Sequence, residues 1–568
     1  MKQSARRRAG LARGFVVIGC VALAVVAAPA TLVVHAAQAA TVKPVAAAGI
    51  GTEAARNAPW CDPKDARIAI PHQSRPRCVR PLEKGESNGG ATYAGVDKDS
   101  IKVVAIVPTK EQQRAAVGQP GVVPPTNRAT NAPGYLEDAV VDWLTVLEET
   151  HPTWGRKIEF VVFNPTGTSE EAQRADALAV IAMKPFAVMN AAVTSNTATG
   201  AGPAFVAAIA SAKILVFTAT GTNQDAAAQA PYRWQAVFDN DASAVNGAEF
   251  IGKALVGETA KWAGDPALRT KTRVFGAIYP DRNLTFDYFE DTFAKHKGAK
   301  LTTKVQYTVP LDPGMIAASN QQEAPILMAK LKEEGVTSVI VYTSSAMVRE
   351  AMKAATNLNY FPEWIFPGLG VLDLEVITRG FDPAQLPHAF GIGSLLINVA
   401  NGTDPATTYF NWYWGTNQGT YSAGVLSYLK MFITGVMQAG PKLTPQTFQQ
   451  ALFSGGPSGG AASNSVQSYM SGFGRSAGLP YDEYSTIGLD YAMMWWNPNA
   501  TGKSKISPVE GKGMFMYLNN GKRYHAGQWP KGEPKFFDPG ASIMQFDTMP
   551  PTEIPKDYPC KGCPSVSA

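Results

Sequence analysis

Short apolar runs alternate with helical patterns in two successive series along this chain. The first series starts at 101–107 (IKVVAIV) and the second at 274–279 (VFGAIY). Runs of this length rich in Val, Ile and Phe favour buried strands. Strands that alternate with helices predict parallel sheets with helices on both faces. Since 568 residues exceed one core, we expect an α/β fold of two similar lobes, hinged around a central ligand cleft.

The same pattern places the individual elements and the boundaries. Apolar stripes and capping signals predict helices over 136–147, 172–183, 287–296, 323–334 and 346–357. Buried strands are predicted at 158–163, 214–217, 305–309, 338–342 and 364–366. The aromatic-rich segments after residue 400 are interpreted as core. The predicted organisation is an export signal (1–40), a linker and Cys-containing N-terminal segment (41–97), lobe I (98–238 and 400–500), lobe II (239–399 and 501–540) and a Pro/Cys tail (541–568).

The first forty residues have the pattern of an export signal. Five basic residues precede an apolar core at 15–34, and Ala37-Gln38-Ala39 offers a small-residue cleavage site. Cys20 follows a lipobox-like VIG and is an alternative, lipid-anchored start, which the continuing apolar run disfavours. The formal charge of +5 belongs to this segment, since the remaining chain has 46 basic and 46 acidic residues. A neutral chain gives no electrostatic reason to expect nucleic acid as a partner. No later segment has the apolar length of a membrane span.

Four cysteines remain after the predicted cleavage, namely Cys61, Cys78, Cys560 and Cys563. An even number in an exported chain suggests two disulfides with three possible connectivities. Cys560 and Cys563 form a C-x-x-C in a Pro-rich tail, where a structural bond is more plausible than a redox motif. We predict a Cys61–Cys78 bond across the Pro-rich stretch between them. Crosslinks from Cys61 to Cys560 or Cys563 are the alternative.

Three of the predicted strands run into loops of hydroxyl side chains. The loops are PFAVMNAAVTSNTATG (185–200), KILVFTATGTN (213–223) and TSVIVYTSSAM (337–347). In an open parallel sheet, ligands collect at the carboxyl ends of the strands. Hydroxyls without a neighbouring base suit recognition better than catalysis. The alternative interpretation is that Ser and Thr only cap the following helices.

Other motifs do not favour an enzyme. Gly456-Pro457-Ser458-Gly459-Gly460 matches G-x-S-x-G, but it lies in a flexible loop instead of a strand–turn–helix. The histidines have no metal-ligand spacing, and no phosphate-binding glycine motif follows a strand. We therefore expect no catalytic residues, no metal and no cofactor.

In its order of motifs, the region 90–530 resembles the type 1 periplasmic binding fold. The similarity is to the leucine/isoleucine/valine-binding branch of ABC-transporter solute-binding proteins, of an actinobacterial type. It is carried by the opening GVDKDSIK (95–102), the strand and loop ILVFTATGTN (214–223), the strand at 339–342 and WIFPGLGV (364–371).

The resemblance implies which residues would contact a ligand. By position, they are Thr194, Ser195, Thr220 and Thr222 in lobe I, and Leu284 and Leu369 in lobe II. Ser344 and Ser345, in the third hydroxyl loop, are the other predicted contacts of lobe II. The family's acidic partner for a substrate ammonium falls at Leu369. A buried ammonium without a carboxylate is costly. A simple amino acid is thus disfavoured unless Asp373 or Glu375 compensates, and an acid, an amide or a larger apolar molecule is the alternative ligand.

The resemblance also implies an extracytoplasmic binding protein that delivers a small molecule to a membrane permease. Domain closure around the ligand would be its mechanism. A ligand-sensing ectodomain or a cell-envelope binding protein without transport is the alternative, and an exported hydrolase would need a base beside the hydroxyl loops.

Overall fold

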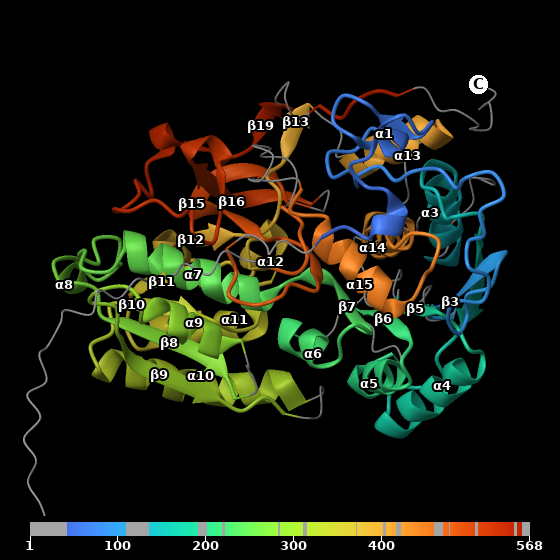
Figure 1. Ribbon diagram of the computed structural model, residues 1–568. Helices are drawn as coiled ribbons and strands as arrows, with labels where there is room; N and C mark the ends of the chain where they lie inside the picture. The colour runs from blue at the N-terminus through green and yellow to red at the C-terminus, as the bar shows by residue number, and fades with distance from the viewer. Residues whose placement is uncertain are drawn as a thin grey trace, which may run out of the picture. The chain divides into compact units, whose positions relative to one another are not determined.

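The computed structural model describes residues 43–109, 136–190, 201–218, 222–281, 285–310, 315–370, 372–401, 405–415, 422–458, 470–475, 478–505, 509–549 and 554–558. The predicted signal, the Cys20 alternative and the Cys560/Cys563 pair lie outside these residues. Within them, two separate sheets organise the chain (Figure 1). We call the smaller sheet with the helices packed on it lobe I, and the larger sheet with its helices lobe II.

The sheet of lobe I has six parallel strands in the order β14-β7-β6-β5-β3-β4. The strands are β3 (Ser100–Ile106), β4 (Lys157–Phe163), β5 (Ala187–Met189), β6 (Leu215–Thr218), β7 (Arg233–Phe238) and β14 (Ser485–Ile487). Strand β3 lies next to the edge strand β4 and pairs with β4 on one side and β5 on the other, so Val103 lies opposite both Phe160 and Ala187. This order places the first predicted strand second from one edge of its sheet.

Successive residues of these strands point to opposite faces, and each face has its own helices. Val103 and Ala105 pack in a core with α3 (Leu136–Thr150), α13 (Pro405–Trp414), α14 (Ser422–Gln438) and α15 (Pro445–Ser454). Val104 and Ile106 pack in a second core with α4 (Glu170–Ala182) and α5 (Pro203–Ser211). The aromatic residues after 400, such as Tyr409 and Tyr413, are buried in the first core, which confirms their interpretation as core.

The sheet of lobe II repeats the strand order of lobe I in its parallel half. The parallel strands run β9-β8-β10-β11-β12, and antiparallel strands extend the sheet beyond β12 through β15, β16 and β18, with β17 paired to β15. The bounds are β8 (Phe275–Pro280), β9 (Leu301–Tyr307), β10 (Ser338–Val341), β11 (Glu363–Pro367), β12 (Ala389–Gly393), β15 (Asp490–Lys503), β16 (Glu510–Leu518), β17 (Arg523–His525) and β18 (Ser542–Ile543).

Helices cover both faces of this parallel half as well. On one face lie α7 (Asn240–Ala254) and α9 (Phe286–Phe293), and on the other lie α10 (Ile316–Glu333) and α11 (Ser345–Asn357) (Figure 1). Helix α10 begins earlier than the predicted 323 and contains Pro325. The matching order of the two sheets, each between helical layers, confirms the predicted fold class.

The chain passes between the two sheets three times. The first passage is Asp239, between β7 and α7; the second runs from β12 to α13 through β13 (Val399–Asn401); the third is Gly488–Leu489, between β14 and β15. Because β15 belongs to the lobe II sheet, the last boundary falls at 488–489 and not at the predicted 500. The aromatic run DYAMMWW (490–496) carries no signal that separates an antiparallel extension from a return to lobe I.

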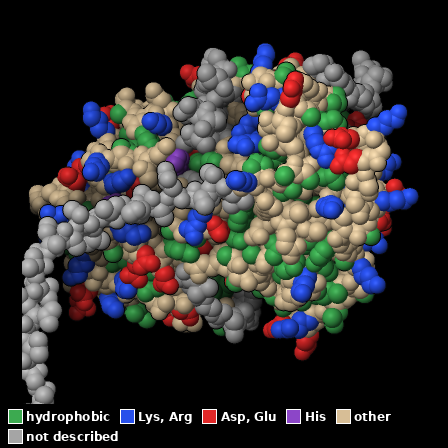
Figure 2. Space-filling model, viewed as in Figure 1, with side chains coloured by type: hydrophobic (Ala, Val, Ile, Leu, Met, Phe, Trp, Pro, Cys, Tyr) green, Lys and Arg blue, Asp and Glu red, His purple; other side chains and the backbone are tan. Residues whose placement is uncertain are grey.

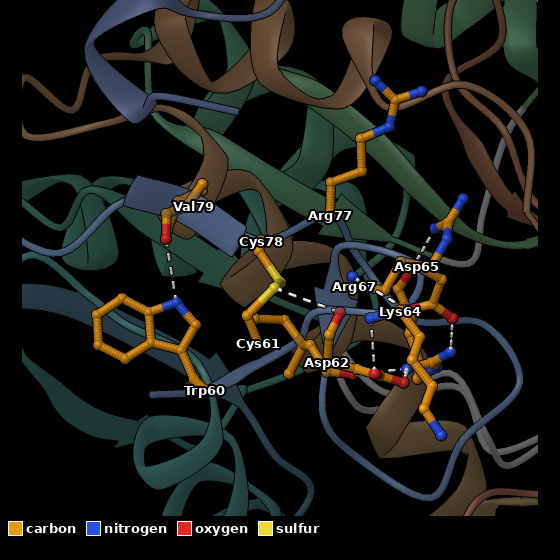
Figure 3. Close-up of a disulfide and its surroundings, with 12 residues drawn as sticks. Trp60, Cys61, Asp62, Lys64, Asp65, Arg67, Arg77, Cys78 and Val79 are labelled. Carbon is orange, nitrogen blue, oxygen red and sulfur yellow. Dashed lines mark hydrogen bonds and ion pairs between the residues drawn. A yellow bond between two sulfur atoms is a disulfide. The ribbon is translucent and has the colours of Figure 1, made fainter. Parts of the chain in front are cut away.

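A Cys-containing N-terminal segment packs on lobe I. It holds η1 (Ala46–Ala48), α1 (Glu53–Arg56), β1 (Cys61–Asp62) and β2 (Arg67–Ile68), and its Ile68, Ile70 and Val79 enter the lobe I core. Cys61 and Cys78 form a disulfide, which confirms the predicted pair (Figure 3). The Trp60 indole beside it donates a hydrogen bond to the Val79 carbonyl at 3.1 Å. The remaining elements are α6 (Asn223–Ala228), α8 (Pro266–Arg269), α12 (Glu375–Thr378), η4 (Leu386–His388), η6 (Asn519–Gly521), η7 (Pro539–Ala541) and β19 (Phe546–Thr548).

Candidate functional site at the junction of the two sheets

The first turn of α7 lies where strands of the lobe II sheet end. The Ser243 hydroxyl donates to the Gly368 carbonyl at 3.0 Å, just after β11. The Tyr342 hydroxyl, just after β10, donates to the Asn240 carbonyl at 3.0 Å and lies 2.7 Å from the Thr285 hydroxyl. A Cβ at Gly247 would lie 2.7 Å from the Pro367 carbonyl, so only glycine allows this close packing. The carboxyl ends of β10 and β11 therefore face the first passage between the lobes.

Three buried carboxyl groups gather at this passage. Asp239 caps α7 by accepting from the Asp241 and Ala242 backbone N–H groups at 2.9 Å each, and it accepts from the Tyr481 hydroxyl at 2.6 Å. Glu483 accepts from the Ser485 N–H at 2.6 Å. Asp241 is fully buried, and neither of its carboxyl oxygens has a hydrogen-bond partner among the described residues.

Burial and repulsion between the carboxyl groups determine the pKa values of Asp241 and Glu483. Burial first, and then the Asp239 carboxylate, raise the pKa of Asp241 to about 8. The backbone N–H of Gln224, at the start of α6 in lobe I, opposes this shift without reaching hydrogen-bond geometry. Burial and Asp239 also raise the pKa of Glu483 well above its usual range. Near neutral pH the cluster therefore retains protons that exposed carboxyls would lose.

Aromatic hydroxyls from both lobes surround the acidic cluster. Burial and the Asp239 and Asp241 carboxylates raise the pKa of Tyr288 on α9, and the Tyr288 ring lies 4.9 Å from that of Tyr481. Tyr342 and Tyr491 have pKa values raised well above the usual range, chiefly by burial. These phenols stay protonated, so they donate and accept hydrogen bonds without adding charge.

Of the predicted lobe I contacts, the described residues include Thr222 alone. Thr194, Ser195 and Thr220 lie outside them. Thr222 is the N-cap of α6: its hydroxyl accepts from the Asp225 N–H at 3.1 Å, and the Asp225 carboxylate accepts from the Thr222 N–H at 2.8 Å. The hydroxyl hydrogen is not used by this capping box. Thr222 therefore caps a helix, as the alternative interpretation has it. Its hydroxyl hydrogen can still be donated to a ligand.

The predicted lobe II contacts lie around the ends of β10 and β11. Leu284 lies outside the described residues. Ser344 is the N-cap of α11 and accepts from the Met347 N–H at 3.4 Å, while Ser345 is the first residue of that helix. Leu369 is partly buried and packs against both cores of lobe II. Whether any of these side chains touches a ligand stays a prediction.

Asp373 and Glu375 do not offer a free carboxylate. The Glu375 carboxylate is 2.7 Å from the Lys505 ammonium, with both side chains buried. Asp373 accepts from the Leu395 N–H at 2.8 Å, and burial raises its pKa. Asp373 thus holds the loop after β11 to the residues that follow β12, and Glu375 holds it to the residues that follow β15, so both carboxyl groups are already engaged within lobe II.

The acidic cluster was missed from the sequence. Its members come from FDNDAS (238–243) and PYDEYST (480–486), which are more than two hundred residues apart. Asp239 follows a strand and precedes a helix, so it resembles an ordinary N-cap. Only the pairing of β14 with β7 brings Glu483 beside it. The one available signal was the acidic pair Asp239 and Asp241 at a strand end.

Other features bear on the function classes. Ser458 of the G-x-S-x-G match follows α15, and its hydroxyl lies 3.2 Å from that of Ser74, so it is not on a strand–turn–helix. Among the described residues, no group of three His, Cys, Asp or Glu side chains could hold a metal ion, and no helix is long and apolar enough to cross a membrane. Figure 2 shows Lys and Arg interspersed with Asp and Glu on the visible face.

Comparisons with known proteins give similar folds only. No protein-family model matches the chain, and no curated protein matches it. Similar solved structures include a leucine-, isoleucine-, valine-, threonine- and alanine-binding protein from Brucella ovis, with 13% identity over 77% of this chain and 98% of that one, and a TM-score of 0.46. A periplasmic binding protein from Burkholderia mallei gives 10% identity, coverages of 78% and 98%, and a TM-score of 0.43.

A third similar structure is an ABC-transporter solute-binding protein from Rhodopseudomonas palustris BisB5 in complex with 3,4-dihydroxybenzoic acid. Its identity is 11%, its coverages are 76% of this chain and 99% of that one, and its TM-score is 0.41.

Proposed function

We propose that this chain is an exported solute-binding protein of an ABC importer, which holds a small molecule between its two lobes. One observation carries the proposal: two sheets whose parallel strands have the same order are joined by three passages, and the carboxyl ends of β7, β10 and β11 meet at the first passage. Ligands of open α/β sheets bind outside the carboxyl ends of strands. The first and third passages, of one and two residues, suit hinge motion between rigid lobes.

The proposed mechanism is binding with closure and involves no covalent step. The described loops around the junction offer hydroxyls, amides and tyrosines, and the carboxyls there are capped or protonated. Such groups orient a polar ligand, whereas acid–base catalysis needs a group that exchanges its proton with the substrate. Closure would then present a defined surface to a permease. The predicted contacts at Thr194, Ser195, Thr220, Thr222, Leu284, Ser344, Ser345 and Leu369 belong to this proposal.

A ligand screen tests the proposal directly. The purified chain without residues 1–40 is heated with acids, amides, amino acids and amphipathic compounds, because a ligand that binds only the folded form raises the melting temperature. Compounds that raise it are followed by calorimetry and by small-angle scattering. We expect one class to bind with a stoichiometry of one and to reduce the radius of gyration. A hit that is hydrolysed or altered by the protein would contradict the non-enzymatic mechanism, and a screen without any binder would contradict the proposal.

A further inference from the structure

The C-terminal segment from Ser542 to Tyr558 joins the two lobes outside the three passages. Its first part belongs to lobe II. Strand β18 pairs with β16, so Ile543 lies opposite Tyr517, and the Trp495 indole donates to the Ser542 hydroxyl at 2.9 Å. Ile543 and Phe546 pack against the lobe II core. We call residues 542–549 and 554–558 the strap.

The middle of the strap follows the second passage. Strand β19 runs parallel to β13, with Phe546 opposite Val399 and Thr548 opposite Asn401 (Figure 1). The Phe546 N–H donates to the Asn398 carbonyl at 2.8 Å. The strap therefore pairs with the second passage, where the chain leaves lobe II for α13 of lobe I.

The last part of the strap docks on the disulfide-closed loop of the N-terminal segment. The Lys556 ammonium forms ion pairs with Asp62 and, at 3.3 Å, with Asp65. The Tyr558 hydroxyl donates to the Asp62 carboxylate and accepts from Arg75 at 3.2 Å. The Trp412 indole of α13 donates to the Tyr558 carbonyl. Every one of these partners belongs to lobe I or to the segment packed on it.

The docking loop is fixed, whereas the docked end can be released. The Cys61–Cys78 bond closes the loop that carries Asp62, Asp65 and Arg75 (Figure 3). The side chain of Asp62 is only 6% exposed, whereas that of Lys556 is 44% exposed. Burial opposes ionisation of Asp62, but Lys556 and Tyr558 outweigh it and hold the pKa of Asp62 below its usual range. Because water already reaches the Lys556 ammonium, its hydration offsets part of the ion-pair energy when the end is released.

We propose that the strap is a releasable fourth link, which restrains the movement of the two lobes while its end is docked on the disulfide-closed loop. A chain segment attached to both lobes excludes the lobe orientations in which its two attachment points would be far apart. Seven residues separate Thr548 from Lys556, so the docked end stays within a short length of chain from β19. While its end is docked, the strap therefore limits the movement of the two lobes. Release of that end widens the range of lobe orientations.

Trypsin cleavage after Lys556 measures docking. The variant Asp62→Asn removes the charged acceptor of both Lys556 and Tyr558, and a lost hydrogen bond to a charged group shifts an equilibrium about tenfold or more. We expect cleavage to accelerate about tenfold, and to accelerate also when the disulfide is reduced. The matched control is Glu290→Gln, which removes the Lys304 ion pair at 2.9 Å on the surface of lobe II. Equal cleavage in Asp62→Asn and the native chain would overturn the docking.

Hydrogen exchange at the three passages then measures the restraint. In Asp62→Asn and in Tyr558→Phe, exchange should rise at Asn240–Ala242, 394–401 and 488–490, while the inner strands β3 and β10 keep their protection. The Tyr558→Phe change lies at a half-exposed position, so it leaves the cores intact. Faster trypsin cleavage with unchanged exchange at the passages would overturn the restraint. No ligand is present in either measurement, so the outcome is independent of the proposed function.

Discussion

Asp241 shows how a single residue can lower the stability of the fold. It is buried beside Asp239 without a hydrogen-bond partner among the described residues, and its pKa is raised from the ordinary value of 3.8 to about 8. The folded state then holds a proton that the unfolded state releases above pH 4. Stability is therefore lost progressively as pH rises from about 4 to about 8 and is constant above.

We expect Asp241→Asn to raise the melting temperature, and by more at pH 8 than at pH 5. The amide keeps the volume and removes both the like charge and the proton linkage. Thermal unfolding at the two pH values, followed by circular dichroism, is the measurement. The exposed Asp291→Asn on α9 is the control and should give the same shift at both pH values. A destabilised Asp241→Asn protein would show that this carboxyl supports the structure.

Thr222 combines two roles that a pair of variants can separate. Thr222→Val removes the N-cap of α6 and should lower stability by about 0.5–2 kcal/mol. Thr444→Val removes an equivalent capping box at α15, also in lobe I, and should cost about as much. For a ligand found in the screen, only Thr222→Val should weaken binding, about ten- to a hundredfold, since a hydrogen bond to a charged group is worth about 1.5–3 kcal/mol. Equal binding in both variants would remove Thr222 from the site.

At the scale of elements, the period of the apolar pattern was sufficient for the fold class and most strands. β3, β6, β8, β10 and β11 lie where apolar runs predicted them, because buried parallel strands must be apolar on both faces. The edge strand β4 also lies where predicted, although its residues are only partly buried. The first residues of some strands and helices were less predictable. β9 starts at Leu301, ahead of the predicted 305, since its first half alternates buried and exposed residues. α10 continues N-terminal to Pro325, which packing against β9 and α11 tolerates.

The candidate site was less predictable than the elements, for a physical reason. Thr222 and Ser344 follow strands directly, so local sequence places them at strand ends. Asp239, Tyr481 and Glu483 meet only through tertiary pairing of β14 with β7. The local apolar periodicity does not predict which strands distant in the sequence will pair with each other.

The pairing of β11 with β12 depends on one glycine. Gly391 has a φ of +151°, and a Cβ there would lie 2.1 Å from the Phe366 carbonyl oxygen. We expect Gly391→Ala to cost more than the ~1–3 kcal/mol of backbone strain alone, because β12 must move away from β11. Urea unfolding is the measurement. Gly85→Ala, with a φ of +82° and nothing within 4 Å of its Cβ, is the control for strain without a clash. Similar losses for both would show that the strands adjust.

For the whole molecule, neither lobe is a continuous piece of chain. The main core of lobe I combines residues 48–236 with residues 409–484. We therefore expect the fragment 41–238 to lack a stable fold, because α13, α14, α15 and β14 would be missing from one face and one edge of its sheet. Circular dichroism and thermal unfolding of the fragment check this, with the chain without residues 1–40 as the control. A cooperative transition in the fragment would contradict it.

Three passages and one strap also have a mechanical consequence. An odd number of passages leaves the two ends of a chain in different lobes, and the strap returns the end to the lobe where the chain began. Tension pulling the ends apart would thus load the Lys556 and Tyr558 contacts first, then the short pairs β19–β13 and β18–β16. These contacts would break one at a time before the strands of either sheet separate. The strap would therefore detach under tension while both cores stay folded.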